Sequence, residues 1–391
     1  MNIVFKEALP VLEKLMIAGY EAYFVGGCVR DFLLDREIND VDIATSATPD
    51  EVKVVFGHTI DVGIEHGTVV VLLEDKSYEV TTFRIDGAYL DSRRPSCVAF
   101  VRSLEKDLAR RDFTINALAM SIHGDIDDFF GGRRDIEERI IRAVGNPYER
   151  FDEDALRMLR AIRFQSQLGF NIEDATFDAI ARLSHHITDI SQERITVEMN
   201  KTMMGSQAVL GLNAMSMSGL TDYLPGIKGL SAEKLASLDA LETLEEKWIA
   251  LLLSLDDEEP AKTLREWKQS RVFIKKAIAI HRLFLDIVQH GWDKKILFDA
   301  GIDTVLSVCR LMGEKQEDVL RLFERFPIRS YQELAVSGQH LLSWSNDRRA
   351  GRWVKELLDQ IVIAILAGEL NNGEEEIHEW LIRKNRLEIK S

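Results

Sequence analysis

The residues with the clearest chemical potential lie between positions 26 and 42 of the chain. Gly26 and Gly27 separate a predicted buried strand from a predicted helix, where glycines let backbone N–H groups approach phosphate oxygens. Arg30 follows on that helix and adds a positive charge. Asp40 and Asp42 alternate with apolar residues as in a strand, so both carboxylates are expected on one face, where they suit Mg2+. The spacing predicts a site for a nucleoside triphosphate and Mg2+.

Each half of this segment also has a simpler interpretation. A Gly-Gly pair is most often a turn, and an Asp-x-Asp sequence is most often the solvated end of a strand. Together and in this order, the two halves resemble the nucleotidyltransferase signature of the polymerase-beta superfamily. A metal ion held there would align the attacking and leaving oxygens of a phosphoryl-type transfer.

Two further polar clusters follow along the chain. At residues 110–119, the simpler interpretation is that Asp112 caps a helix. The alternative is that Arg111 reaches triphosphate oxygens and Asp112 accepts a ribose hydroxyl. A predicted helix over residues 151–164 gathers its apolar side chains on one arc and its arginines on the other side. The simpler interpretation of that helix is a solvated face with an Asp154–Arg157 ion pair, worth roughly 0.2–0.5 kcal/mol.

The same pair of residues also matches the edge of a nucleobase. Cytosine and adenine each offer an amino donor beside a ring-nitrogen acceptor, which an aspartate and an arginine complement. Uracil and guanine present the opposite polarity and would leave buried groups unpaired. Asp154 with Arg157 would then select C and A without a nucleic-acid template.

These clusters together carry a family resemblance. The chain resembles the class II tRNA nucleotidyltransferases of the bacterial type, which add or repair the 3′-terminal CCA of tRNA. Five motifs of that family occur in order, at residues 26–42, 110–119, 128–135, 153–157 and 192–201. Beyond about residue 210 the resemblance is limited to helical character and length. None of the nine histidines precedes an aspartate, so the HD phosphohydrolase domain of some relatives is not expected.

The resemblance implies roles for individual side chains. Asp40 and Asp42 would hold Mg2+ at the catalytic centre, with Glu79 as a candidate third carboxylate. CTP and ATP are the implied substrates and pyrophosphate is the product. The residues implied in nucleotide binding are Gly27, Arg30, Arg111, Asp112, Asp154, Arg157, Arg160 and Arg163.

The polar segment at residues 84–95 helps to distinguish between the possible activities of such an enzyme. Alone it is a surface loop, but in this family it resembles the flexible loop that permits the final adenosine addition. Enzymes limited to adding CC lack that loop. The remaining alternatives are an enzyme that adds only A, a related poly(A) polymerase, and a catalytically silent tRNA-binding protein on the same scaffold.

Composition limits the class of protein. A chain of 391 residues with 46% hydrophobic and 29% charged residues indicates a soluble globular protein of several domains. No apolar run reaches membrane-spanning length, and three cysteines without disulfide or metal spacing fit the cytoplasm. The net charge of −16 argues mildly against a nucleic-acid partner, although an acidic protein can carry a local basic surface.

The elements that must position these residues change character near residue 146. Short β-rich runs at 69–73, 78–83 and 97–101 precede that point, and amphipathic helices follow it. The expected class is α+β, with a polymerase-beta-like nucleotidyltransferase head over 1–146 and an elongated all-α remainder. That remainder divides into a neck (147–210), a body (211–328) and a tail (329–391), with tRNA on body and tail. The basic segment 383–390 is either a phosphate-contacting end or a solvated terminus, and a monomer or homodimer is expected.

Overall fold

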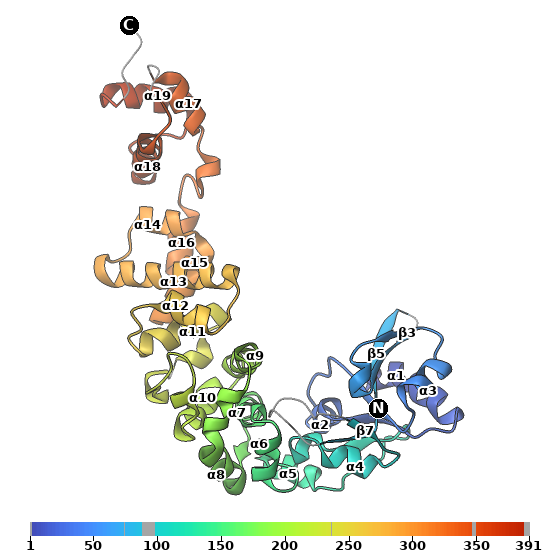
Figure 1. Ribbon diagram of the computed structural model, residues 1–391. Helices are drawn as coiled ribbons and strands as arrows, with labels where there is room; N and C mark the ends of the chain where they lie inside the picture. Colours follow the sequence, from blue (N-terminus) through green and yellow to red (C-terminus); the bar gives the residue numbers. More distant parts are fainter. Residues whose placement is uncertain (1, 74, 88–97, 236, 346–348, 387–391) are drawn as a thin grey trace. The chain divides into compact units, whose positions relative to one another are not determined.

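The computed structural model describes residues 2–73, 75–87, 98–235, 237–345 and 349–386 (Figure 1). The chain divides into two compact units. Unit 1 comprises Met1–Asp239 with Glu266–Lys268, and unit 2 comprises Ala240–Arg265 with Gln269–Ser391. Within the described residues every strand belongs to unit 1, so the predicted α+β class is confirmed. Most of the predicted loop at 84–95 and the end of the basic segment at 383–390 lie outside the described residues.

A seven-stranded mixed sheet organises the N-terminal part of unit 1. Its order is β3-β4-β5-β2-β1-β8-β9, in which β2 and β5 run parallel and the other neighbours run antiparallel. The strands are β1 (Ala22–Val25), β2 (Asp42–Thr45), β3 (Thr59–Asp61), β4 (Thr68–Leu73), β5 (Lys76–Thr82), β8 (Ala119–Met120) and β9 (Ile126–Asp127). The predicted strands at 69–73 and 78–83 are therefore confirmed. The described part of the third forms β7 (Val98–Phe100), which pairs with β6 (Arg84–Asp86) in a separate hairpin.

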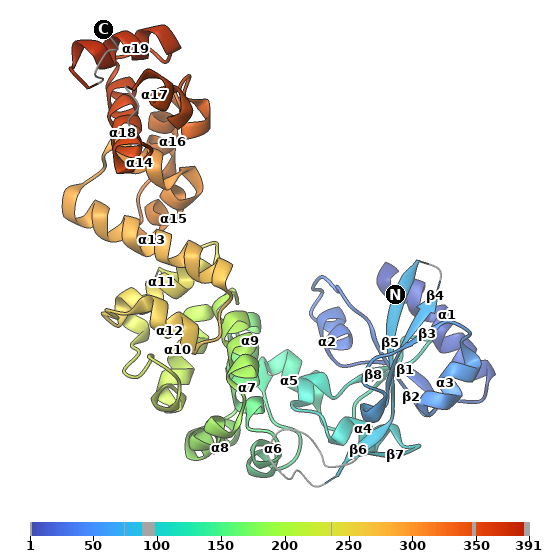
Figure 2. The same cartoon turned by 45° about the horizontal axis from the view of Figure 1, so that its top comes forward.

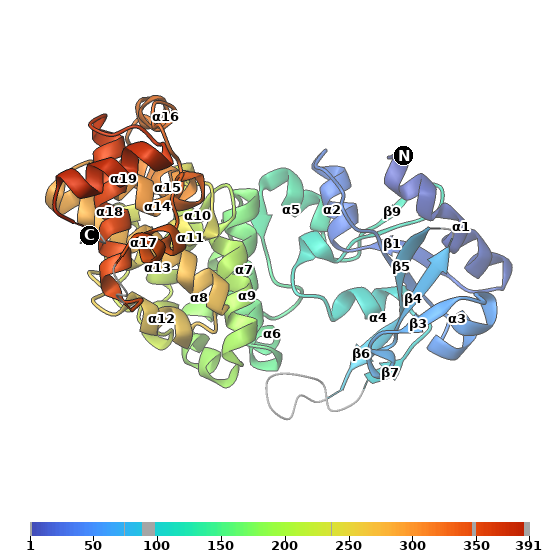
Figure 3. The ribbon, with the colours of Figure 1, turned by 90° about the horizontal axis from the view of Figure 1, so that it is seen from above.

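Apolar helices hold the sheet from one side. Helices α1 (Ile3–Ile17) and α3 (Pro49–Val55) contact each other and pack against the strands (Figure 3). Phe5 of α1 is fully buried, and its ring centroid lies 4.8 Å from that of Phe24 on β1. Burial of a large apolar side chain stabilises the fold by roughly 1.5–3 kcal/mol. This packing fixes the strand that leads into the glycine turn.

The structure corrects the prediction that one strand contains both Asp40 and Asp42. Strand β2 begins at Asp42, and Asp40 lies in the preceding loop. The reason is the neighbouring strand, because β1 ends where Gly26 turns the chain into α2 (Gly27–Leu33) and leaves Asp40 without a β1 partner. The expected alternation survives nevertheless, since both aspartates are exposed and Val41 between them is buried.

Helices take over after residue 146, as predicted. Helix α7 packs against α9 and α10 (Figure 2), and glycines allow the close approach. A Cβ at Gly211 would lie 2.7 Å from Cβ of Ser166 on α7. One short parallel pair, β10 (Ile140–Ile141) with β11 (Asn171–Ile172), interrupts the helical character. The other helices of this part are α4 (Leu104–Ala109), α5 (Gly132–Glu138), α6 (Pro147–Glu153), α7 (Leu156–Leu168), α8 (Asp174–Leu183), α9 (Gln192–Met203) and α10 (Ala208–Met217).

Unit 2 is helical throughout its described residues. Its helices include α11 (Leu244–Ser254), α13 (Arg271–His290), α14 (Lys294–Ala300), α15 (Ile302–Met312), α16 (Gln316–Glu324), α17 (Gly338–Trp344), α18 (Arg352–Ala367) and α19 (Glu374–Arg383). A fully buried carboxylate joins two of them, because Glu246 of α11 accepts from Oγ of Ser307 at 2.7 Å and from Nη2 of Arg310 at 2.6 Å on α15. Among the described residues, no helix combines the length and apolar character needed to cross a membrane.

Candidate active site

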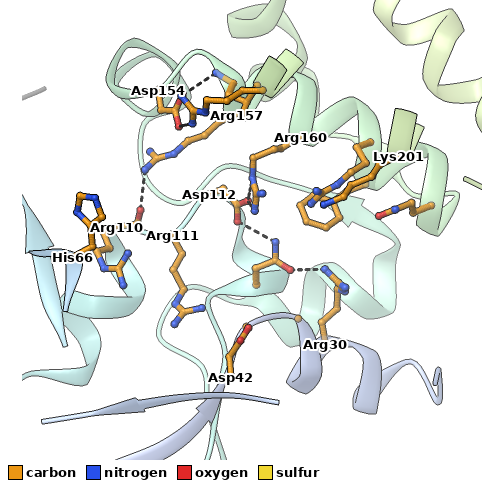
Figure 4. Close-up of a pocket in the computed structure, with 18 of the residues that line it drawn as sticks. Arg30, Asp42, His66, Arg110, Arg111, Asp112, Asp154, Arg157, Arg160 and Lys201 are labelled. Carbon is orange, nitrogen blue, oxygen red and sulfur yellow. Dashed lines mark hydrogen bonds and ion pairs between the residues drawn. The ribbon is translucent and has the colours of Figure 1, made fainter. Parts of the chain in front are cut away.

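A cavity of about 1030 Å3 in unit 1 brings most of the predicted site residues together (Figure 4). Its wall carries eight arginines and one lysine but three aspartates, although the whole chain carries a net charge of −16. Clefts lined by one sign of charge attract ligands of the opposite sign. The lining residues are Gly26, Gly27, Arg30, Asp42, His66, Arg84, Arg110, Arg111, Asp112, Asn116, Asp154, Leu156, Arg157, Arg160, Arg163, Phe164, Gln167, Arg194 and Lys201.

The backbone geometry of the turn at the start of α2 requires a glycine. Gly26 has φ 75° and ψ −131°, a conformation that residues with a side chain rarely adopt. A Cβ at Gly26 would also lie 2.8 Å from Nη1 of Arg111. Gly27 is the first residue of α2, so the turn brings backbone and a guanidinium together at the cavity wall.

Of the three predicted carboxylates Asp40, Asp42 and Glu79, only Asp42 belongs to the lining of this cavity. Asp42 on β2 stands in register with Glu79 on the parallel strand β5. Desolvation by the surrounding protein raises the pKa of Asp42, and the charges of Glu79 and Asp40 raise it further, against the opposing effect of Arg111. Mutual repulsion of this kind is relieved by a cation, so the carboxylates fit a divalent metal.

The described side chains do not form a complete set of protein ligands for that metal. No group of three His, Cys, Asp or Glu side chains within the described residues is placed to hold a metal ion. Mg2+ characteristically uses one or two carboxylates together with water and substrate phosphates, and an incomplete protein shell suits that mode.

Arg110 and Arg111 are held at the cavity wall by one buried aspartate. Oδ1 of Asp107 accepts from Nε of Arg110 at 3.0 Å and from Nη2 at 2.8 Å. Its Oδ2 accepts from Nη2 of Arg111 at 3.3 Å. Burial opposes ionisation of Asp107, but the two arginine charges outweigh it and lower its pKa. Sequence reasoning assigned Asp107 no role, because nothing in its local pattern distinguishes it from an ordinary helical acid.

A continuous chain of hydrogen bonds crosses the cavity wall from α2 to α7. Arg30 forms a two-point ion pair with Asp31 and donates from Nη1 to Oδ1 of Asn116 at 2.7 Å. Nδ2 of Asn116 donates to Oδ1 of Asp112 at 3.0 Å. Oδ2 of Asp112 accepts from Nε of Arg160 at 2.7 Å and also from its Nη2.

Asp112 is therefore an anchor for other side chains. Residues 114–116 form a short 3-10 helix without a side-chain cap, so the interpretation of Asp112 as a helix cap is wrong. Burial opposes its ionisation, yet the charge of Arg160 and the hydrogen bonds from Asn116 and Arg160 hold its pKa well below the ordinary value. Its Oδ1 also accepts from the backbone N–H of Phe113 at 2.8 Å. These four donors use all the lone-pair directions of a carboxylate, so a further hydroxyl must replace one of them.

Asp154 and Arg157 lie at the far side of the cavity from Asp42 and Arg30 (Figure 4). They do not form the ion pair that the simpler interpretation predicts. Oδ1 of Asp154 accepts from the backbone N–H of Leu156 at 3.1 Å, and Oδ2 accepts from Nη2 of Arg194 on α9 at 2.8 Å.

Arg157 has a different set of partners. Its Nη1 donates to Oε2 of Glu153 at 2.7 Å and to the carbonyl of Arg150 at 3.2 Å. Its Nη2 donates to the carbonyl of Arg110 at 3.1 Å. These bonds use three of the five N–H donors of a guanidinium and fix the remaining ones in direction.

The predicted solvated arginine face of α7 is also wrong, because Arg157 and Arg163 are buried. Arg163 donates from Nη1 to Oε1 of Glu198 at 3.2 Å. The Phe164 ring contacts three guanidiniums, with Arg163 at 4.3 Å, Arg30 at 5.1 Å and Arg160 at 5.6 Å from its centroid. Cation–π contacts of this kind orient charged groups in a desolvated wall.

Several cavity residues were not predicted. Three of them, Asn116, Arg194 and Lys201, lie inside the family motifs, so the motifs themselves could have identified them. His66 and Gln167 stand in segments without a motif, so only the folded chain reveals them.

Comparisons with known proteins extend over the whole chain. Residues 22–142 match the Poly A polymerase head domain, 169–230 match the RNA and SrmB-binding site of polymerase A, and 240–381 match tRNA nucleotidyltransferase domain 2. The CCA-adding enzyme of Geobacillus stearothermophilus is 46% identical, with 100% of both chains covered. The CCA-adding enzyme of Geobacillus thermodenitrificans is 47% identical over the same full coverage.

A solved structure agrees with this assignment. The crystal structure of the Bacillus stearothermophilus CCA-adding enzyme in complex with CTP superposes with a TM-score of 0.90 at 44% identity. It covers 99% of this chain and 98% of that one. Nucleotidyltransferases of this family in general use a divalent metal. On these grounds the chain belongs to the CCA-adding enzymes, a family of nucleotidyltransferases.

Proposed function

We propose that this protein adds C, C and A to the 3′ end of tRNA from CTP and ATP, releases pyrophosphate, and works in the cytoplasm. The observation that carries the proposal is the cavity, which combines a cationic wall, a glycine turn and Asp42 with a separate acid–arginine pair. The full-length similarity to CCA-adding enzymes and the CTP complex of a 44% identical relative support it.

The proposed metal is Mg2+, held by Asp40 and Asp42 with Glu79 beside them. The exposure of both aspartates and the raised pKa of Asp42 support this choice. When bound, the ion supplies positive charge that aligns and polarises the attacking and leaving oxygens. Arg30, Arg111 and the glycine turn would hold the triphosphate and then the departing pyrophosphate.

The base would be selected at the opposite side of the cavity. Asp154 is fixed by Arg194, and Arg157 is fixed by Glu153 and the carbonyl of Arg110. A fixed acceptor beside a fixed donor complements cytosine and adenine and leaves buried groups unpaired with uracil or guanine. Arg160 and Arg163, held by Asp112 and Glu198, would support this pocket.

The division of labour along the chain belongs to the same proposal. The head at 1–146 would carry the chemistry and the neck at 147–210 would select the nucleotide. The body at 211–328 and the tail at 329–391 would hold tRNA. A monomer or homodimer is compatible with this arrangement.

Incorporation assays test the proposal directly. Purified protein, Mg2+ and labelled CTP or ATP are supplied with tRNA transcripts that end at the discriminator base or at CC. Addition of C, C and A to the first transcript is expected. Addition of A alone to the CC-ended transcript would instead establish an A-adding enzyme. No addition to either would favour a silent tRNA-binding protein.

A further inference from the structure

Three basic side chains of the cavity lining have no role in the nucleotide site proposed above. They are His66, Arg84 and Arg110. His66 ends the short 3-10 helix Ile64–His66 before β4, Arg84 begins β6, and Arg110 is the C-terminal cap of α4. Three separate segments of the chain therefore each contribute a basic group to the same cavity.

Neighbouring groups fix the positions of Arg84 and Arg110. Nη1 of Arg84 donates to the backbone carbonyl of His66, and the backbone N–H of Arg84 donates to Oδ1 of Asp107 at 3.2 Å. The same oxygen accepts from Nε and Nη2 of Arg110. Asp107 shares its one negative charge between Arg110 and Arg111, and the carbonyl that orients Arg84 is neutral. Positive charge therefore remains at this wall for an anion.

The order of the strands separates these groups from the proposed triphosphate site. The glycine turn follows β1, Asp42 begins β2, Glu79 lies on β5 and His66 precedes β4. These four strands are neighbours in the order β4-β5-β2-β1. In Figure 4, His66 and Arg110 likewise lie on one side of Asp42, and Arg30 lies on the other.

This separation matches the geometry of nucleotidyl transfer. The attacking and leaving oxygens lie roughly in line on opposite sides of the phosphorus atom. If pyrophosphate leaves towards Arg30 and the glycine turn, the attacking hydroxyl arrives from the side of His66 and Arg110. That hydroxyl belongs to an RNA strand whose nucleotides are joined by phosphates. Guanidinium groups bind phosphate through paired, charge-assisted N–H bonds.

We propose that Arg84 and Arg110 bind a backbone phosphate at the 3′ end of the tRNA and so bring its terminal hydroxyl to the metal site. The imidazole of His66 offers a further donor at the same surface. The inference rests on the proposed function, since this ligand is the acceptor of the same reaction. The ligand is a single-stranded RNA terminus, distinct from the nucleoside triphosphate on the other side of Asp42.

Equilibrium binding of a labelled tRNA minihelix that ends in CC tests the proposal without nucleotide or turnover. Each of the last three phosphates is replaced in turn by a neutral methylphosphonate. At one position, wild type should lose about tenfold in affinity, because a charge-assisted bond is lost. Arg84→Gln and Arg110→Gln should bind the unmodified RNA about tenfold more weakly and should no longer respond to that replacement.

Arg102→Gln is the matched control. Arg102 also donates to a carbonyl and a carboxylate, those of Ser46 and Glu51, but it does not belong to the cavity lining. This variant should keep both the affinity and the response to the neutral linkage.

Salt dependence and kinetics add two independent measurements. The slope of log affinity against log salt should fall by about 0.7 for each arginine removed. Arg110→Lys retains the charge without the planar fork, so it should keep the slope of wild type. In nucleotide addition, Arg110→Gln should raise KM for the RNA and leave KM for CTP unchanged.

The outcomes separate this inference from the proposed function. No nucleotide addition by wild type would refute the function, whereas the binding measurements test the RNA site alone. Wild type that responds to none of the neutral linkages would overturn the inference. It would also be overturned if folded variants responded to the neutral linkage as wild type does, or if they raised KM for CTP with unaltered RNA affinity.

Discussion

Arg194 on α9 donates to Oδ2 of Asp154 at 2.8 Å, from a position forty residues later in the chain. The acceptor of the proposed base-reading pair is thus oriented by a neighbouring helix and not by Arg157, its partner in that pair. If this pair reads the base, its selection depends on how α7 and α9 pack as much as on the two residues themselves.

Arg194→Ala should relax the choice of base. Without Arg194, Asp154 keeps its bond to the N–H of Leu156 but its second oxygen is no longer held. The preference for CTP over UTP, measured as a ratio of kcat/KM, should fall by about tenfold, which corresponds to the loss of one directional charge-assisted bond. Arg182→Ala removes an exposed arginine that pairs with Asp178 and should leave the ratio unchanged. An unaltered ratio in Arg194→Ala would contradict the orienting role.

Asp42→Asn should abolish activity and stabilise the metal-free protein. The pKa of Asp42 is raised, so its ionised form is disfavoured in the folded state. The fold therefore loses stability as pH rises through the pKa of this carboxyl, and a neutral amide removes that loss at pH 7.

Two measurements check the effect of Asp42→Asn. Nucleotide addition should be abolished, and the melting temperature in the presence of a chelator should rise. Asp61→Asn changes an acid that pairs with Lys53 on the surface and should produce neither effect. A lower melting temperature or persistent turnover in Asp42→Asn would argue against the metal assignment.

Asp112→Asn should destabilise unit 1. The pKa of Asp112 is depressed, so its stabilising effect is present above the ordinary carboxyl value of about 3.9 and is lost as pH falls through the folded pKa. Removal of the negative charge deprives Arg160 of its ion-pair partner, at a cost of about 3 kcal/mol in the free energy of unfolding. Arg160 is 33% exposed, which places the effect at the low end of the range for buried pairs.

Denaturant unfolding of wild type and Asp112→Asn across a pH series measures this effect. The difference in unfolding free energy should be greatest near neutrality and should shrink in acid. A difference that is independent of pH would mean that the charge of Asp112 does not support the fold.

Glu246→Gln should destabilise unit 2 and spare the chemistry. The buried carboxylate bonds Ser307 and Arg310, and these charge-assisted bonds outweigh its burial and lower its pKa. The free energy of unfolding should fall by about 3–5 kcal/mol, with specific activity retained at temperatures where the variant is folded. Glu317→Gln disrupts an exposed pair with Arg321 and should change stability by less than about 1 kcal/mol. Equal effects of the two variants would contradict this account.

The local sequence predicts those parts of the fold that depend on the type and spacing of neighbouring residues. The glycine turn, the strands at 69–73 and 78–83 and the change to helices after 146 were predicted and found. Apolar spacing identified the buried arc of α7, since Met158 and Ile162 are fully buried. Each of these features depends on neighbours within a few residues.

The partners of charged side chains could not be predicted in the same way. Asp154 pairs with Arg194 and Asp112 pairs with Arg160, both across distant parts of the chain. A charged side chain can form an ion pair with any group of opposite charge that the fold brings near. Local spacing therefore predicted an ion pair between Asp154 and Arg157 and a cap at Asp112 that the fold does not form.

The cavity is cationic although the chain as a whole is acidic, and this contrast limits where the protein attracts a negatively charged ligand. At physiological ionic strength, charges on the surface act over a Debye length of about 8 Å. A polyanion outside the cavity therefore lies mostly beyond the reach of the cavity arginines, whatever the net charge of −16 of the chain. A strand terminus that enters the cavity meets the arginines instead. The charge of the cavity thus acts on the end of an RNA chain that enters it.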